Sequence, residues 1–325
     1  MPKKIESEKN RLKRVGMGKY SGKSSGTKAL LLLLVSLFLI FSASCSSDRQ
    51  DERSAGIENL GQNPRIIATS MSITEIMEKM DVDLVGVPAT KLSKMPKRYK
   101  DVTVVGMPMN PDLEIIKSLK PDLILSPASL IADLAPKYEN LNLEYGFLNM
   151  NSVEGMYKSI DDLGRILHRE KKAKELRDEY EAFLKEYANK NEGKKHPKVL
   201  MLMGFPGSYV VATDKSYMGS LAKMAGAENV YTGETRQFMN VSVEDMLKKE
   251  PDIILRGSHA IPDEVKEMFK KEFKTNDTWK NFKAVKEDRV YDLDYNLFGM
   301  SAKFNYPEAL AQLEEIFYEK NAENN

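Results

Sequence analysis

One histidine of this chain stands where a buried strand would end. Residues 253–255 read Ile-Ile-Leu, an apolar run of strand length, and the chain continues Arg-Gly-Ser-His to His259. Imidazole is a common metal ligand in proteins. The other two histidines, His168 and His196, lie among charged and polar residues and are predicted to be solvated. A single loop histidine can also be an ordinary surface residue, so the residues alone leave both interpretations of His259 open.

Two thioethers form a second candidate group. Met107 and Met109 lie in the segment Val-Gly-Met-Pro-Met-Asn-Pro, residues 105–111, where glycine, proline and asparagine predict an irregular loop. Methionine is usually core filler, and the chain has 18 of them. These two differ because their neighbours place them in a loop. A thioether and an imidazole from opposite walls of one cleft are the axial pair of low-spin haem iron.

A repeated segment predicts how these groups are positioned. Residues 111–126 read PDLEIIKSLKPDLILS and residues 242–256 read SVEDMLKKEPDIILR. Each copy combines helical spacing of apolar residues, a Pro-Asp stop and a short apolar run of strand length. Glu114 precedes Pro121 by the same seven positions as Glu244 precedes Pro251. Two copies so far apart predict two lobes of similar fold, with a ligand bound between them.

The remaining pattern predicts an α/β protein with two Rossmann-like lobes joined by a long rigid spanning helix. An N-terminal lobe is expected over 65–150, a helical linker over 151–192 with its spanning helix at 171–190, and a C-terminal lobe over 193–325. Ligands of open parallel sheets bind beyond the carboxyl ends of the strands. His259 and the methionine loop are therefore both expected at the cleft. Strands are expected at 66–68, 84–87, 103–105, 123–125, 143–148, 198–203, 253–255 and 290–293, and a turn at 204–209.

Charge is distributed unevenly along the chain. The net charge is +1, but nine of the 49 bases and two of the 48 acids lie in residues 1–28. The other residues keep 40 bases and 46 acids and are mildly acidic. Nucleic-acid binding is therefore excluded as a function.

The N-terminal residues have the pattern of an export signal. The basic leader is followed by thirteen residues, 29–41, that are apolar except for Ser36 and too few to cross a bilayer, and then by Ser-Ala-Ser-Cys. Small residues before Cys45, the chain's one cysteine, resemble a bacterial lipobox. Residues 1–44 are then a signal peptide, Cys45 is a lipid anchor, and 45–64 form a flexible tether. The alternative is a stray thiol behind an ordinary cleavage site.

The chain also resembles a known family over residues 65–320. It is similar to class III substrate-binding proteins of ABC importers, and within them to haem-binding lipoproteins of the iron-regulated surface determinant system. The segments that carry the resemblance are RIIATSMSITEIM, MPKRYKDVTVVGMPMNPDLEIIKSLKPDLILS, HPKVLMLMGFPGSYVVATDKSYMG, PDIILR with His259, PDEVKEMFKKEF and WKNFKAVK. The resemblance implies one haem b (iron protoporphyrin IX) per chain, ligated by Met109 and His259, with Met107 as a neighbour.

Further residue roles are implied by the same resemblance. Glu114 and Glu244 would dock into the two permease subunits, although an acid in the first helical turn also favours the helix dipole. The chain departs from the family at 88–94, where the usual tyrosine is absent. The implied haem-pocket positions are Thr69, Ser70, Met71, Lys91, Ser208 and Tyr209.

The implied setting is the outer face of the cell membrane of a Gram-positive type bacterium. The expected partners are an ABC permease with its ATPase, and upstream surface proteins that relay haem; the protein itself is expected to be a monomer. No Ser-His-Asp arrangement, phosphate loop or zinc pattern predicts an enzyme. The alternative is a binding protein for a ferric siderophore or cobalamin, which would not need a methionine and a histidine.

Overall fold

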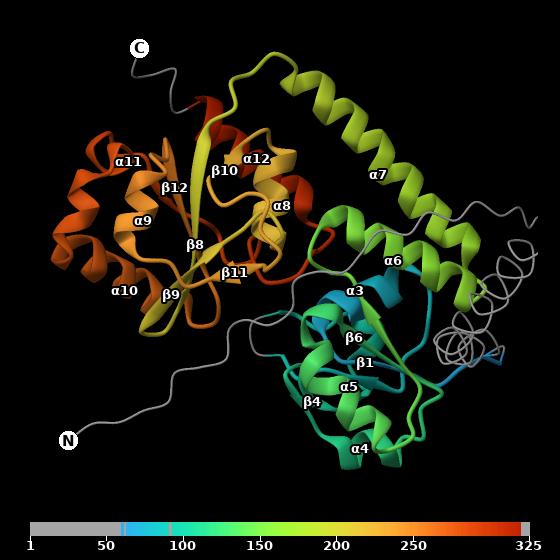
Figure 1. Ribbon diagram of the computed structural model, residues 1–325. Coiled ribbons are helices and arrows are strands. Elements are labelled where there is room, and N and C mark those ends of the chain that lie inside the picture. The colour runs from blue at the N-terminus through green and yellow to red at the C-terminus, as the bar shows by residue number, and fades with distance from the viewer. Residues whose placement is uncertain (1–59, 62, 91–92, 320–325) are drawn as a thin grey trace, which may run out of the picture. The chain divides into compact units, whose positions relative to one another are not determined.

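The computed structural model describes residues 60–61, 63–90 and 93–319, which fall within one compact unit of the chain (Figure 1). The N-terminal lobe is built on a five-stranded parallel sheet with the strand order β3-β2-β1-β6-β7. Its strands are β1 (Ile66–Ala68), β2 (Gly86–Val87), β3 (Thr103–Val104), β6 (Leu123–Pro127) and β7 (Tyr145–Leu148). Its helices are α3 (Met71–Lys79), α4 (Leu113–Ser118) and α5 (Ile131–Glu139), with 3-10 turns at Lys97–Tyr99 and Ala128–Leu130.

The C-terminal lobe has a six-stranded sheet with the order β11-β9-β8-β12-β13, in which β10 also pairs with β8. Its strands are β8 (Lys198–Phe205), β9 (Ser208–Ala212), β10 (Glu228–Asn229), β11 (Phe238–Met239), β12 (Ile253–Ser258) and β13 (Val290–Asp292). Its helices are α8 (Tyr217–Met224), α9 (Val243–Lys248), α10 (Pro262–Thr275), α11 (Lys283–Lys286) and α12 (Tyr306–Glu314), with a 3-10 turn at Asp277–Asn281 and a π-helical turn at Glu315–Glu319. The two lobes confirm the predicted α/β architecture with mainly parallel sheets.

The turn predicted at 204–209 is shorter than expected. Strand β8 continues to Phe205 and β9 begins at Ser208, so the antiparallel hairpin turns through Pro206 and Gly207 alone. Gly207 has φ +80°, which a glycine adopts without steric cost. The prediction that residues 204–209 form a turn is therefore wrong at both ends. The hydrogen-bonded pairing of β8 with β9 continues through residues whose types are also common in loops.

The repeated segment has one structure in both lobes. Helices α4 and α9 each end in a turn whose last residue, Lys120 or Glu250, has a positive φ of 47° or 48°. The aspartate that follows the proline then pairs with the first strand of its own lobe. Asp122 Oδ2 accepts a hydrogen bond from Arg65 N at 2.7 Å, and Asp252 Oδ2 accepts one from Lys198 N at 3.1 Å. The Pro-Asp stop therefore fixes the start of β6 beside β1, and the start of β12 beside β8.

Two helices form the linker between the lobes. Helix α6 (Val153–Ile166) and helix α7 (Glu170–Asn191) are separated by a short break at which His168 has φ +54°. Helix α7 is tied at both ends: Lys172 Nζ lies 3.6 Å from Asp81 of the N-terminal lobe, and Lys190 Nζ lies 2.8 Å from Glu314 of α12. Within residues 60–61, 63–90 and 93–319, no helix is both long and apolar enough to cross a membrane.

A C-terminal segment also contacts the N-terminal lobe. Ala302 N donates to Met150 O at 2.7 Å, and Lys79 Nζ of α3 lies 5.7 Å from the centre of the Phe304 ring. One apolar cluster includes buried side chains of both lobes and of the linker. The segment that leads into α12 therefore helps to hold the two lobes together.

The carboxylate of Glu314 joins the linker to the last helix. Its side chain is only 6% exposed and lies 2.8 Å from both Lys190 Nζ and Lys194 Nζ. Burial raises the pKa of Glu314, but the hydrogen bonds and charges of the two lysines outweigh burial, so that its pKa is lowered overall. The ionised form is therefore the one that stabilises the fold.

We expect Glu314→Gln to lower the free energy of unfolding at pH 7 by about 2 kcal/mol, the range of hydrogen bonds to charged groups. Because the folded pKa is lowered, this contribution is present above the ordinary pKa of 4.5 and is lost as the pH falls below it. Urea unfolding of both proteins between pH 7 and pH 3 measures the difference. The exposed first-turn acid of α12 provides the control Glu308→Gln. A difference independent of pH would contradict the role of the charge.

Candidate functional site

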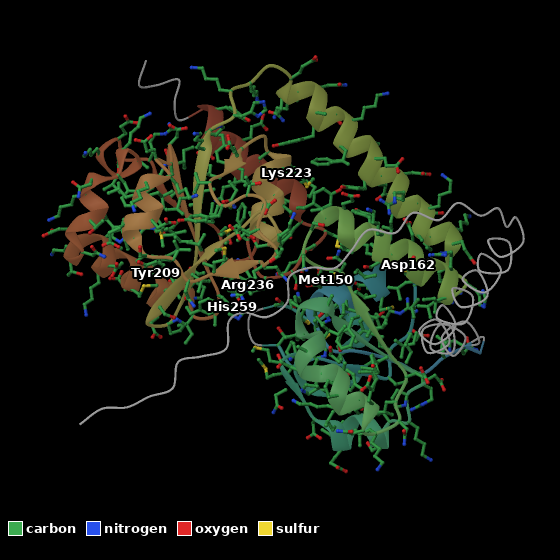
Figure 2. All side chains as sticks on the ribbon, viewed as in Figure 1. Met150, Asp162, Tyr209, Lys223, Arg236 and His259 are labelled. Carbon is green, nitrogen blue, oxygen red and sulfur yellow. The ribbon has the colours of Figure 1, made fainter. Side chains whose placement is uncertain are left out.

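His259 lies directly beyond the carboxyl end of β12, as the sequence predicts (Figure 2). The last residue of the strand, Ser258, is paired with Gly204 of β8, and His259 N donates to Gly204 O at 2.8 Å. The imidazole meets the Phe205 ring nearly edge-on, with 5.3 Å between the ring centres. Two neighbouring strands therefore fix both the backbone and the ring of this half-buried histidine.

The protonation of His259 follows from its surroundings. Burial lowers the pKa of the His259 imidazole below its ordinary value of 6.5, because the charged form is less well solvated there. The ring is thus neutral at neutral pH and keeps a lone pair, which is the form that binds a metal ion. Among the residues that the structure describes, no cluster of three or more His, Cys, Asp or Glu side chains could hold an ion.

Met107 and Met109 lie on a small hairpin after β3. Strand β4 (Gly106–Met107) pairs with β5 (Asn110–Pro111) in antiparallel fashion, with Gly106 opposite Pro111 and Met107 opposite Asn110. The prediction of an irregular loop is wrong here, because Gly106 adopts φ +94° and lets the chain form a short ladder. The hairpin turns through Pro108 and Met109. Met109 is 67% exposed and Met107 is 53% exposed, so both thioethers are accessible.

Exposed apolar side chains gather at the carboxyl ends of the strands. In the part of the chain that the structure describes, five large apolar residues are exposed, and each one ends a parallel strand or lies in the segment that follows one. The sequence did not single out three of them: Val104 at the end of β3, Ile131 after β6 and Ile261 after β12. The available signal for the two isoleucines was their place a few residues beyond a buried strand. The five residues are Val104, Met107, Met109, Ile131 and Ile261.

The predicted pocket residues after β1 face their own lobe. Thr69 is buried, and its Oγ1 donates to Leu125 O at 3.2 Å and lies 2.8 Å from Ser126 Oγ. Ser70 is the N-cap of α3, where its Oγ accepts from Ile73 N at 3.4 Å. Met71 is the first, half-buried residue of that helix. The Thr69 hydroxyl is therefore already bonded to β6, and the Ser70 hydroxyl already caps α3.

Ser208 and Tyr209 lie on β9 and not in the predicted turn. Ser208 is exposed, whereas Tyr209 packs with Phe269 and Trp279 and donates from its hydroxyl to Glu272 Oε1 at 3.2 Å. Burial and the Glu272 carboxylate raise the pKa of Tyr209. Lys91 and Cys45, the other two predicted positions, lie outside the described residues.

Glu114 and Glu244 occupy matching places in α4 and α9. Each is the second residue of its helix and is exposed. The N-cap hydrogen bonds are made by other side chains: Asp112 Oδ1 accepts from Glu114 N at 3.0 Å, and Ser242 Oγ accepts from Asp245 N at 3.3 Å. The two glutamates still favour the helix dipoles, but the described part of the chain gives neither carboxylate a hydrogen-bond or ion-pair partner.

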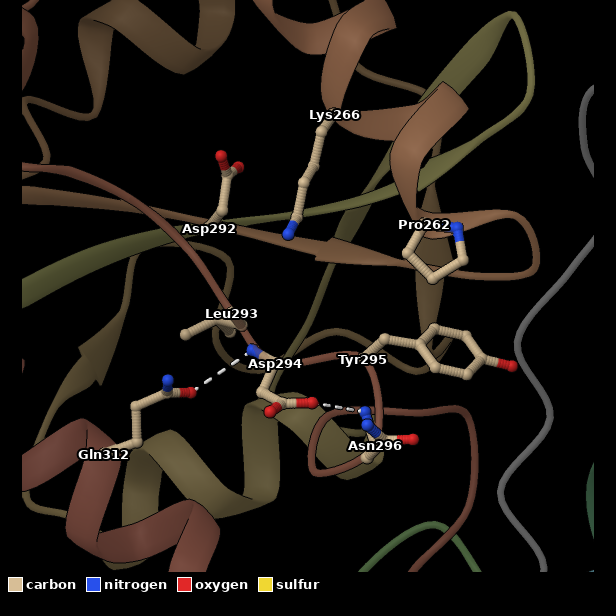
Figure 3. A pocket seen from close by; sticks show the side chains of 8 residues that line it. All are labelled: Pro262, Lys266, Asp292, Leu293, Asp294, Tyr295, Asn296 and Gln312. Atoms are coloured by element: carbon tan, nitrogen blue, oxygen red, sulfur yellow. Dashed lines mark hydrogen bonds between the residues drawn. The ribbon is translucent and has the colours of Figure 1, made fainter. Parts of the chain in front are cut away.

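Two cavities are lined by residues other than the five exposed apolar ones. A cavity of about 520 Å³ begins at Pro262 and lies beyond β13, where Asp294 Oδ1 accepts from Asn296 N at 2.7 Å (Figure 3). The second, of about 340 Å³, is lined by Asn149, Asn151, Ser152, Asp214, Lys215, Thr235 and Gln237. Neither of these two cavities is lined by Met109 or His259. The first cavity is lined by Pro262, Lys266, Asp292, Leu293, Asp294, Tyr295, Asn296 and Gln312.

Comparison with known proteins identifies relatives over most of the chain. Residues 66–297 match the family described as periplasmic binding protein. The chain is 44% identical over 292 residues to the high-affinity heme uptake system protein IsdE of Staphylococcus aureus, which covers 90% of this chain and 97% of that protein.

Solved structures give the same grouping. An ABC transporter substrate-binding protein of Listeria monocytogenes is 47% identical with a TM-score of 0.75, covering 79% of this chain and 99% of that one. Staphylococcus aureus IsdE complexed with heme is 46% identical with a TM-score of 0.74, covering 78% and 99%. The vitamin B12 binding protein BtuF of Vibrio cholerae, 18% identical with a TM-score of 0.63 and covering 81% and 98%, shares the fold.

Proposed function

The chain belongs to the periplasmic binding protein family, and from this premise we propose that it binds haem and delivers it to an ABC permease for iron uptake. Its relatives are substrate-binding proteins of ABC importers and not enzymes. The two lobes have the class III fold of that family. The chain is accordingly a substrate-binding protein. We infer its substrate from the chemistry of the exposed residues at the carboxyl ends of its strands.

One observation carries the proposal of haem: accessible thioethers, a neutral imidazole and exposed apolar side chains all lie at or beyond the carboxyl ends of parallel strands in the two sheets. Haem needs this combination. Its ring has two wide apolar faces, whose removal from water contributes about 25 cal/mol per Å², while its iron takes one axial ligand from each side. A siderophore or cobalamin pocket has no need of a methionine and a histidine.

In this proposal Met109 of the N-terminal lobe and His259 of the C-terminal lobe are the axial ligands of a single haem b. The accessibility of Met109 and the neutral, fixed ring of His259 support the pair. Met107, two residues from Met109, is a neighbour of the iron site. Thr69, Ser70, Met71, Lys91, Ser208 and Tyr209 are proposed to surround the haem, with the backbone and not the hydroxyl groups of Thr69 and Ser70 facing it.

The test is a comparison of ligands with one purified protein. The apoprotein is mixed with haemin, cyanocobalamin or a ferric siderophore, and unbound ligand is removed by gel filtration. We expect a Soret band to elute with the protein at one haem per chain, and the other two ligands to elute separately. Retention of cobalamin or siderophore in preference to haemin would refute the proposal. Light scattering on the same column is expected to show a monomer.

The anchor at Cys45 is part of the same proposal. Small residues before the chain's one cysteine support a cell-surface protein held by lipid on the outer face of the membrane. We expect Cys45→Ala to abolish labelling by radioactive palmitate and to release the protein from washed membranes. Cys45→Ser provides a matched variant of nearly equal size. Labelling that persists in either variant would show that the lipid is attached elsewhere.

The proposed partners follow from the role. The importer supplies a permease and an ATPase, and haem is expected to arrive from surface proteins that relay it. Glu114 and Glu244, one exposed acid on the matching helix of each lobe, are proposed as the contacts with the two permease subunits.

A further inference from the structure

The backbone directly after His259 takes an unusual course. Ala260 has φ +57° and Ile261 has φ +22°, so two consecutive residues with Cβ atoms lie at positive φ. For a β-branched residue this is a steric outlier. The residue that follows is Pro262, the first of α10, whose ring further restricts Ile261. No side chain caps the helix at this corner.

Burial of the Ile261 side chain does not explain this strained corner. Ile261 is 54% exposed, so the conformation does not bury its side chain in the core. Strained residues of this kind persist where the surrounding structure imposes them, and they concentrate at ligand sites. The corner presents an isoleucine to solvent two residues after the proposed iron ligand.

The N-terminal lobe presents an isoleucine at the matching place. Ile131 follows Pro121 by ten positions, and Ile261 follows Pro251 by the same ten. Each lies beyond the strand of the repeated segment, β6 or β12, and at the start of the next helix, α5 or α10. Ile131 is 51% exposed. The repeat therefore extends beyond its strand and ends in both lobes on an exposed isoleucine.

We propose that Ile131 and Ile261 are the apolar contacts by which the two lobes hold the porphyrin ring, so that the site recognises the planar macrocycle independently of its metal. This inference rests on the proposed binding of haem and adds the ligand class: a porphyrin, with or without iron. A ring that covers an isoleucine removes apolar surface of that side chain from water, which is favourable. Their shared register places one such contact in each lobe, as a ligand held from two sides requires.

The experiment compares haemin with metal-free protoporphyrin IX. Wild type is expected to bind both, measured by the Soret band for haemin and by quenching of Trp279 fluorescence for both ligands. Ile131→Ala and Ile261→Ala should each weaken both ligands about tenfold, the effect of losing roughly two buried methylene groups. Met109→Ala should weaken haemin by a larger factor than protoporphyrin IX, because the metal-free ring has no iron to ligate and only an apolar contact is lost.

The outcomes separate this inference from the proposed function. If wild type does not bind haemin, the proposed function fails. If wild type binds haemin but not protoporphyrin IX, or if both isoleucine variants bind protoporphyrin IX as tightly as wild type does, the inference fails and haem binding stands. The inference would also fail if wild type formed a dimer that Ile261→Ala abolishes while its porphyrin affinity stays unchanged. The isoleucines would then belong to an interface between two copies of the chain.

A pair of glycine variants tests the corner itself. Ala260 and Glu250 lie just beyond the two ends of β12, and both have positive φ. Glycine should relieve strain at either position and raise the Tm of both variants. We expect Ala260→Gly to speed dissociation of protoporphyrin IX a few-fold, because the relaxed corner no longer holds Ile261 in place, whereas Glu250→Gly should leave it unchanged. Equal dissociation rates in wild type and Ala260→Gly would overturn the role of the corner.

Discussion

His259→Ala is expected to weaken haem binding more than Met109→Ala and to convert the bound iron from predominantly low-spin to high-spin. Imidazole is the stronger ligand for ferric iron, while a thioether is soft and binds it weakly. We expect a loss of about 100-fold for His259→Ala and about tenfold for Met109→Ala, on the scale where each tenfold is about 1.4 kcal/mol. Residual binding is expected in both, because neither change removes the apolar contacts of the ring.

The controls for this prediction use neighbouring and remote residues of the same type. Met107 lies two residues from Met109 and is also exposed, so it could replace the missing thioether. The double change of Met107 and Met109 to Ala is therefore the cleaner test of sulfur ligation. His168→Asn alters an exposed histidine at positive φ, which asparagine tolerates. Magnetic circular dichroism decides: a wild-type signature in the double variant, or an unchanged spectrum in His259→Ala, would refute the ligand pair.

The double variant Glu114→Ala, Glu244→Ala should bind haem like wild type and fail to stimulate ATP hydrolysis by the reconstituted transporter. Both carboxylates are exposed, lie at the same place of the repeated helix, and are not N-caps, since Asp112 and Ser242 fill that role. Each single variant should reduce stimulation, because each lobe would contact one permease subunit. Stability should fall by less than about 1 kcal/mol per site, the usual effect of an acid on a helix dipole.

A matched pair of acids shows whether the effect is specific. Glu170 and Glu308 are also exposed and lie in the first turns of α7 and α12. Their double alanine variant loses the same charge and similar helix-dipole interactions, and it should stimulate ATP hydrolysis normally. Equal stimulation of ATP hydrolysis by both double variants would contradict the docking role of Glu114 and Glu244 and leave them only their interaction with the helix dipoles.

The sequence predicts most of the architecture because the repeated Pro-Asp stops and the apolar runs indicate the same helices and strands. The two Pro-Asp stops, which lie between α4 and β6 and between α9 and β12, are visible in the sequence. The structure shows why they recur: Asp122 and Asp252 each accept a hydrogen bond from the backbone at the start of their own lobe. Apolar runs predict the central strands well, because strands buried on both faces must be apolar throughout. His259 could be placed for the same reason, since it directly follows such a run.

Other features could not be predicted because they depend on distant partners or on exposure. The hairpin at 106–111 and the start of β9 consist of residues that also suit loops, and only their pairing partners decide. Tyr209 was expected in a turn, but it lies on β9 and its hydroxyl bonds to Glu272, 63 positions away. The exposure of Ile131 and Ile261 contradicts the usual burial of isoleucine, so composition and spacing alone would assign both to the core.

The bond between Lys190 and Glu314 has a consequence for the order of folding. It joins residues 124 positions apart, whereas the clamps of Asp122 and Asp252 span 57 and 54 positions. All strands of the first sheet lie between residues 66 and 148, so this lobe can close as soon as they have left the translocation pore or the ribosome. The end of α7 can be fixed only when α12, which carries Glu314 124 positions after Lys190, has been made. A half-made molecule therefore consists of a finished first lobe and a helix without its final contact, and fixing the end of α7 requires the closure of a long loop.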